Sequence, residues 1–161
     1  MLKKIYNKVT HEWDTSVEEA LKSFIRLPAL SPDFDKKWEE NGVLLKALED
    51  AQAWAEKQGI KGLRCEIIKD DGFTPCLFVE VDATSDKKFE RSVFFYGHLD
   101  KQPPNEGWDQ DKSAWEPVIQ NGRLYGRGAV DDGYAFYTSL AAVKALQTLG
   151  IPHPRCVGSV S

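Results

Sequence analysis

The sequence predicts an α/β fold, a three-layer α/β/α sandwich, and three observations support this class. Apolar residues recur at the spacing of an amphipathic helix around residues 17–25 and 136–146. Residues 63–67 alternate apolar and polar side chains, as half-buried strands do. Residues 93–96 form a continuous apolar run typical of a strand buried on both faces. Helices and strands in this alternation indicate a sheet covered by helices.

The first two predicted helices are defined by their apolar stripes and by their end signals. We expect the first to start at Ser16, which precedes Glu19 with capping-box spacing, and to end before Pro28. The second is weakened by Gly42 and stopped at Gly59. The stripe of the first helix is Val17, Ala20, Leu21, Phe24 and Ile25, and that of the second is Leu44, Leu48, Ala51 and Ala55.

Turn residues predict two hairpins. Asp70-Asp71-Gly72 joins the strand at 63–67 to a strand at 76–81, and a polar loop at 82–88 leads to the apolar strand at 93–96. Asn121-Gly122 is a strong two-residue hairpin signal between two short strands. These short strands cover residues 118–120 and 123–125.

The last part of the chain predicts a helix and then a strand. The helix begins near Asp132 and is closed by Gly150 and Pro152. Its apolar face consists of Phe136, Leu140, Val143 and Leu146. Cys156 and Val157 look like the opening of a further buried strand.

Composition indicates a globular protein and excludes several classes. The 161 residues are 42% hydrophobic, which is enough for one domain with its own core. A net charge of -4 and a pI near 5.4 argue against a nucleic-acid partner. The first residues carry positive charge but no apolar stretch, so we predict neither a secretory signal nor a membrane span. We therefore expect a cytoplasmic location.

The cysteines do not predict a disulfide framework or a thiolate zinc site. Cys65, Cys76 and Cys156 are odd in number, lie far apart and form no Cys-x-x-Cys pair. We expect each to be a small buried hydrophobic residue.

The first candidate site is His98-Leu99-Asp100, at the carboxyl end of the most apolar strand, where open α/β sheets place ligands. In an extended segment residues i and i+2 point the same way, so the Asp100 carboxylate can reach one imidazole nitrogen while the other stays free for a metal. An isolated His-x-Asp is more often a surface histidine bonded to a neighbouring acid.

The second candidate is the segment 126–133, which contains Asp131 and Asp132 where the hairpin meets the long helix. Paired acids there have a structural alternative, because Asp is a good N-cap and suits the positive end of a helix dipole. The segment also resembles a dinucleotide fingerprint in its first two glycines. Asp131 occupies the third glycine position, however, and its carboxylate would repel a pyrophosphate.

The two segments together indicate a metal site. His98 and Asp131 both lie at turns that leave apolar elements, and divalent metals accept a mixed nitrogen and oxygen ligand set. Zinc, cobalt or manganese would suit such ligands.

These motifs resemble the dizinc metallopeptidases, a family that includes carnosinase-like dipeptidases, aminoacylases, and succinyl-diaminopimelate and acetylornithine deacylases. The preceding helices and hairpin resemble the usual start of the catalytic domain, so the resemblance covers essentially the whole chain. The matching residues are Phe94-Phe95-Tyr96-Gly97-His98-Leu99-Asp100-x-Gln102-Pro103, Gly107-Trp108, Trp115-x-Pro117 and Asn121-Gly122-Arg123-Leu124-Tyr125-Gly126-Arg127-Gly128-x-x-Asp131-Asp132.

The resemblance implies roles for three residues. His98 would bind one metal, Asp131 would bridge two metals, and Asp100 would act at the catalytic site by orienting His98. The Asp131-Asp132 peptide bond would be cis. Relatives cleave an amide bond with a hydroxide held between two divalent ions, with zinc as the expected metal, and with a glutamate as general base. The substrate would be a dipeptide or an N-acyl amino acid, and relatives are often homodimers.

Two departures from the family pattern shape the expected function. The chain has Asp131-Asp132-Gly133-Tyr134 where many relatives have Asp-Asp-Lys-Gly, which leaves the subfamily open. The family's Glu-Glu pair, further ligands and lid domain are not in these residues, so we expect residues 1–161 to be the N-terminal part of a catalytic domain and an incomplete, inactive fragment. The alternatives are a non-catalytic product or pseudoenzyme acting as an interaction module, and a plain α/β binding module.

Overall fold

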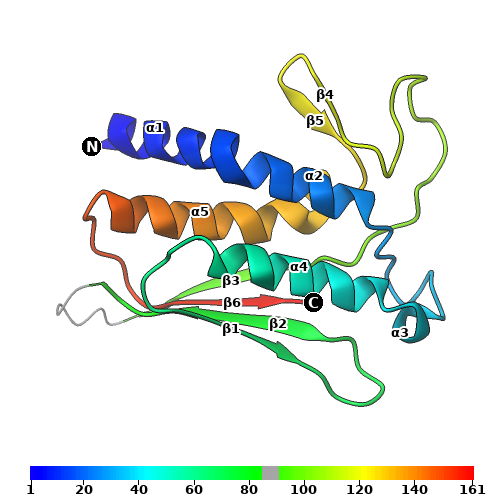
Figure 1. Cartoon of the computed structure of the whole chain (residues 1–161), viewed down its shortest axis with the longest axis horizontal. Helices are drawn as coiled ribbons and strands as arrows, with labels where there is room; N and C mark the ends of the chain where they lie inside the picture. Colours follow the sequence, from blue (N-terminus) through cyan, green and yellow to red (C-terminus); the bar gives the residue numbers. More distant parts are fainter. Residues whose placement is uncertain (85–90) are drawn as a thin grey trace.

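The computed structural model describes residues 1–84 and 91–161, and it confirms the α/β class (Figure 1). Residues 85–88 of the predicted polar loop lie outside the described residues. A mixed four-stranded sheet has the order β1-β2-β6-β3, and a two-stranded sheet pairs β4 with β5. The described helices lie on one side of the larger sheet (Figure 1), and they therefore form one of the two helical layers of the predicted sandwich.

The first helical segment starts much earlier than the sequence predicts. Helix α1 (Leu2–Glu12) continues through the π-type turn η1 (Trp13–Val17) into α2 (Glu18–Arg26). The predicted N-cap at Ser16 is wrong because the helix is already formed there. The Ser16 hydroxyl instead accepts a hydrogen bond from the Trp54 indole at 3.0 Å. The predicted end before Pro28 is confirmed.

The second predicted helix is divided at Gly42, the residue that weakens it in the sequence. Helix α3 (Trp38–Asn41) ends and α4 (Val43–Glu56) begins at this glycine, whose φ of 67° is left-handed. The predicted stripe on α4 is fully buried and belongs to the core shared with α2 and the sheet. Breaking the helix at Gly42 therefore leaves the core-facing stripe intact.

The strands follow the predicted periodicity, with one exception. β1 (Leu63–Ile68) and β2 (Cys76–Val81) form the expected antiparallel hairpin, and β6 (Cys156–Val160) pairs with β2 antiparallel and with β3 (Val93–Gly97) parallel. The exception is β3, which was predicted to be buried on both faces. In the described structure it is an edge strand, with Phe94 63% and Tyr96 69% exposed.

The segment between β3 and β6 contains the second predicted hairpin and the long helix. Strands β4 (Val118–Gln120) and β5 (Arg123–Tyr125) meet at the Asn121-Gly122 turn. Both turn residues have positive φ, as this type of tight hairpin requires. The turn η2 (Ala129–Gly133) then leads into helix α5 (Tyr134–Thr148), which connects to β6.

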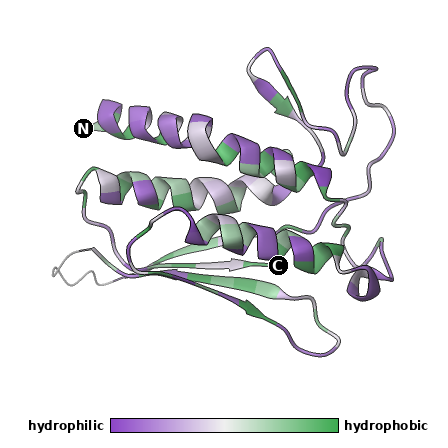
Figure 2. Ribbon diagram, viewed as in Figure 1, coloured by the Kyte–Doolittle hydropathy of each residue, from purple (hydrophilic) through white to green (hydrophobic). Residues whose placement is uncertain are grey.

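The core lies between the helices and the inner face of the sheet. Alternate residues of β2 and β6 are buried against α4 and α5, including Leu77, Val79 and Val160. Figure 2 shows β2 hydrophobic along most of its length, whereas α1 is largely hydrophilic. Among the cysteines, Cys156 is buried as expected, while Cys65 and Cys76 are half-buried and all three are free thiols. None of the helices in the described residues has the length and hydrophobicity needed to span a membrane.

Candidate metal centre

The predicted site lies where β3 ends and the turn before α5 begins. β3 runs parallel to β6, so both strands end at the same edge of the sheet. The Leu99 amide donates to the Ser161 carbonyl at 2.7 Å, which ties the exit of β3 to the end of β6. This is the edge where open α/β sheets place their ligands. Asp131 reaches the same place from η2.

His98 lies between two carboxylates. Its Nδ1 is 3.0 Å from Asp100 Oδ1 and 3.1 Å from the Asp100 backbone oxygen. Its Nε2 is 3.1 Å from Asp131 Oδ1. The structure thus brings together the three residues singled out in the sequence, and Asp100 is positioned to hold the proton on Nδ1 while Nε2 faces Asp131.

The Asp131-Asp132 turn directs one carboxylate to the ring of His98 and the other to its backbone amide. The peptide bond between the two residues is cis, and both residues have non-helical backbone angles inside η2. Asp132 Oδ2 accepts a hydrogen bond of 3.3 Å from the His98 amide. Gly97 allows this approach, because a Cβ atom there would lie 3.2 Å from Asp132 Oδ2.

The helix-cap alternative for these acids is wrong. In the described residues no side-chain hydrogen bond caps η2 or α5, and the N-cap of α5 is Gly133. Asp132 lies at the candidate site, but sequence reasoning assigned it no role there. Adjacent acids before a helix have an ordinary explanation as caps. Its proximity to His98 depends on long-range pairing, and the only sequence signal was its place beside Asp131.

The surroundings of His98 favour its protonated form in the absence of a metal. Burial acts to lower its pKa, but the hydrogen bond with the Asp100 backbone and the charges of Asp100, Asp131 and Asp132 outweigh burial, so the pKa is raised above its usual value. The same negative charges attract a divalent cation. His98 and Asp100 side chains are each 28% exposed and Asp131 is 58% exposed, so the site is open to solvent.

The His98 and Asp131 atoms fit a shared metal ion. Zinc bonded at about 2.0 to 2.1 Å to both atoms in tetrahedral geometry would hold them about 3.3 Å apart. The separation of Nε2 and Oδ1 is 3.1 Å. No cluster of three or more potential ligand residues is found in the described parts of the chain. These residues therefore provide two ligands for a metal ion and one orienting carboxylate.

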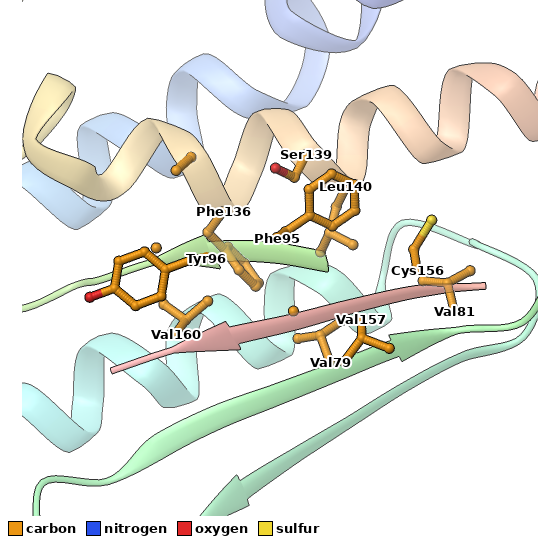
Figure 3. A pocket seen from close by; sticks show the side chains of 13 residues that line it. Val79, Val81, Phe95, Tyr96, Phe136, Ser139, Leu140, Cys156, Val157 and Val160 are labelled. Atoms are coloured by element: carbon orange, nitrogen blue, oxygen red, sulfur yellow. The ribbon is translucent and has the colours of Figure 1, made fainter. Parts of the chain in front are cut away.

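The cavity beside the site is too small for a substrate. It lies between α5 and the inner face of the sheet, where Phe136 and Leu140 point toward Phe95 and Val160 (Figure 3). Its volume is about 20 Å³, and its lining is almost entirely apolar. One water molecule needs about 10 to 15 Å³ and several polar partners, so this apolar space has room for one water molecule at most and none for a substrate.

Comparison with known proteins shows that part of the chain resembles a family of peptidases. Residues 94–160 match the peptidase family M20/M25/M40. The succinyl-diaminopimelate desuccinylase of Aromatoleum aromaticum is 41% identical over 70 residues, covering 42% of this chain and 17% of the relative. The Cys-Gly metallodipeptidase of Schizosaccharomyces pombe is 36% identical over 67 residues, covering 40% of this chain and 14% of the relative.

Solved structures extend the likeness in fold to the whole chain. A di-peptidase from Saccharomyces cerevisiae has a TM-score of 0.75 at 19% identity, covering 100% of this chain and 34% of its own. Human carnosine dipeptidase 1 has a TM-score of 0.74 at 22% identity, and the match covers 99% of this chain and 34% of the dipeptidase chain. This chain therefore spans about a third of the length of these structures.

The resemblance to the M20 metallopeptidases is thus confirmed, over residues 94–160 in sequence and over the chain in fold. His98, Asp100 and Asp131 all lie in the matched segment. The family implies the use of divalent metal ions. The ligand roles of His98 and Asp131, the orienting role of Asp100 and the domain assignment of residues 1–161 stay predictions.

Proposed function

We propose that the chain provides one part of the catalytic centre of a metal-dependent amide hydrolase acting on dipeptides or N-acyl amino acids. The observation that carries this proposal is the placement of His98 between Asp100 and Asp131. Histidine with a carboxylate on each side is the usual arrangement of a metal-binding imidazole and its supporting acid. The names of the M20 relatives support hydrolysis of a peptide or acylated amine.

Each of the three residues has a distinct role in this proposal. His98 Nε2 and Asp131 Oδ1 would hold the ion. Asp100 would accept a hydrogen bond from the Nδ1–H group, which leaves Nε2 unprotonated for metal binding. When bound, a divalent ion supplies Lewis acidity toward the amide carbonyl. Zinc is the first candidate, with cobalt or manganese as alternatives.

The residues that the structure describes bring together too few ligands for a tight two-metal centre. Catalytic zinc ordinarily has three protein ligands, and a two-metal site needs ligands on both ions as well as a general base. We therefore infer that the 161-residue chain binds metal weakly and hydrolyses little or no dipeptide. The cytoplasmic location expected from the sequence and the homodimer formation implied by the family resemblance belong to the same proposal.

Metal titration tests the ligand assignment directly. Zn²⁺ or Co²⁺ is titrated into the purified chain and into His98→Ala and Asp131→Ala, with His11→Ala as a matched control because His11 is an exposed histidine on α1. We expect both site variants to lose the binding that wild type and His11→Ala retain. Equal affinity in wild type and His98→Ala would refute the proposal.

Hydrolysis measurements test the expected incompleteness. Dipeptide cleavage is followed with and without Zn²⁺ or Mn²⁺, and we expect no turnover above background. Metal-dependent turnover that disappears in His98→Ala would show that the chain assembles a complete centre. That result would keep the assigned reaction and overturn the inferred inactivity.

A further inference from the structure

Lys101 is a fully buried lysine directly after the His98-Leu99-Asp100 segment, and it bonds to the end of a distant helix. Only 1% of the surface of Lys101 is exposed to solvent. The ammonium donates to the carbonyl oxygens of Phe24 and Leu27 at 2.6 Å each, and to that of Ile25 at 3.3 Å. These carbonyls belong to the C-terminal end of α2, where a helix leaves its last acceptors unpaired.

The backbone of Lys101 is fixed to the same region. Its amide donates to the Ala29 carbonyl at 2.8 Å, and its carbonyl accepts from the Ser31 amide at 2.9 Å. Residues 98–101 are therefore attached to the segment after α2 by main chain and side chain together. Three acceptors match the three hydrogens of an ammonium. Burial lowers the pKa of Lys101 to about 7.

The loop that carries Asp131 packs against the same lysine. A Cβ atom at Gly128 would lie 2.7 Å from Lys101 Cε, and one at Gly133 would lie 2.4 Å from the ring of Phe24. The Lys101 ammonium lies 3.9 Å from the centre of that ring. The Asp131 loop thus contacts α2 and the lysine stem directly.

We propose that Lys101 is a positioning residue that sets the separation between His98 and Asp131. Its side chain links the exit of β3, which carries His98, to the end of α2, against which the Asp131 loop packs. Loss of the ammonium would leave the carbonyls of Phe24 and Leu27 without their hydrogen-bond donor. It would loosen the junction between the exit of β3, the end of α2 and the Asp131 loop. The inference deepens the proposed metal-binding function and rests on it for the identity of the ligand.

The decisive variant is Lys101→Met, which keeps an unbranched stem and removes the three hydrogen bonds. Two controls separate positioning from general effects. Lys22→Met removes a lysine from the middle of α2, one that pairs with Glu18 and Glu19. Leu48→Ala destabilises the core at a fully buried position on α4, an element that carries none of the acceptors of the Lys101 ammonium. Zn²⁺ affinity is measured by competition with a chromophoric chelator for every protein that unfolding curves show to be folded.

We expect Lys101→Met to bind Zn²⁺ about 10- to 100-fold more weakly than wild type, the range found when groups supporting a metal ligand are removed. Both controls should stay within about twofold of wild type, since the ligand pair and the hydrogen bonds of the Lys101 ammonium are intact in them. Zn²⁺ affinity unchanged in folded Lys101→Met, or reduced equally in Leu48→Ala, would overturn the inference.

A second measurement works without metal and keeps the two proposals distinguishable. The Gly133 amide donates to the Gly128 carbonyl at 2.8 Å, so its hydrogen exchange reports on the Asp131 loop. We expect at least about tenfold faster exchange of this amide in Lys101→Met than in Leu48→Ala. If wild type binds no Zn²⁺ and this difference is found, the positioning role stands and the proposed function falls. Equal exchange in the two variants would refute positioning.

A milder variant covers the possibility that Lys101→Met does not fold. Phe24→Leu keeps every hydrogen bond of Lys101 and removes the ring that lies between the ammonium and Gly133. We expect a smaller change in the same direction, in both Zn²⁺ affinity and Gly133 exchange. No change in either would contradict the proposed junction.

Discussion

At the scale of single residues, the site depends on which atom of each side chain faces its neighbour. His98 uses both ring nitrogens, one toward Asp100 and one toward Asp131. Asp132 contacts the His98 backbone instead of its ring. Two adjacent aspartates therefore contact different parts of His98, because the turn between β5 and α5 points their side chains in different directions.

Asp100→Ala tests the residue that acts through the ring and does not hold the ion. We expect Zn²⁺ affinity to fall about 10- to 100-fold, because the imidazole loses the acceptor that fixes its tautomer. Isothermal titration calorimetry measures the affinity, with exposed Asp33→Ala as the control for loss of one negative charge. If both variants lose the same affinity, Asp100 contributes only through its charge.

At the scale of elements, the helical layer is held together by close approaches and by one buried ion cluster. Glu12 on α1 is nearly fully buried and pairs with Lys144 on α5 at 2.6 Å and with Lys8 at 2.7 Å. Burial acts to raise the pKa of Glu12, but the hydrogen bonds and charges of the two lysines outweigh it, so the pKa is lowered. The Glu12–Lys144 pair fixes α1, a largely hydrophilic helix (Figure 2), to α5.

Glu12→Gln tests this cluster through its pH dependence. A carboxyl group whose pKa is lowered by folding stabilises the protein above its unfolded pKa of 4.5, and this stabilisation disappears as the pH falls through the folded value. We expect Glu12→Gln to lower the free energy of unfolding by about 1.5 to 3 kcal/mol at pH 7, and by progressively less below pH 4.5. Urea unfolding at several pH values measures the difference.

The exposed pair of Arg26 and Glu116 supplies the control for Glu12→Gln. Glu116→Gln should cost less than about 1 kcal/mol, because its ion pair is in solvent. A loss in Glu12→Gln that stays constant down to pH 3 would show that its effect is packing and not charge.

Gly133→Ala tests the contact between α2 and the Asp131 loop. The glycine has a helical φ of -51°, so only space is at stake, and the added methyl group would lie 2.4 Å from Phe24. We expect a loss of about 1 to 3 kcal/mol in the free energy of unfolding, typical of overpacking. Adding Phe24→Leu should recover part of that loss, and a strictly additive double variant would argue against the contact.

At the scale of the whole molecule, the described helices cover one face of the sheet and leave the other open. Phe94 and Tyr96 project from the edge strand β3 on the open face. Edge strands with exposed apolar side chains promote association between chains. This tendency to associate comes from the arrangement of the layers, since the same residues would be buried in a strand covered on both faces.

Phe94→Lys tests this surface. We expect less self-association than in wild type, because a lysine on an edge strand opposes pairing with another chain. Light scattering at matched concentrations measures it. Phe73→Lys is the matched control, since Phe73 is 70% exposed but lies in the turn between β1 and β2. Equal association in wild type and Phe94→Lys would exclude β3 as the cause.

The sequence by itself determined the elements whose cause is local. Periodicity predicted α4, α5, β1 and β2, and the Asn121-Gly122 turn predicted the β4-β5 hairpin, because side-chain spacing and turn chemistry act over a few residues. The motifs also singled out His98, Asp100 and Asp131, since their residue types and positions after apolar elements are visible along the chain.

Only the tertiary structure decided what depends on distant partners. It showed that Ser16 lies inside a helix and contacts Trp54, that β3 is an edge strand, and that Asp132 faces the His98 amide. Lys101 gave no sequence signal, because a lysine is normally exposed. Its role arises from carbonyl oxygens more than 70 positions away, which folding alone brings within hydrogen-bond distance.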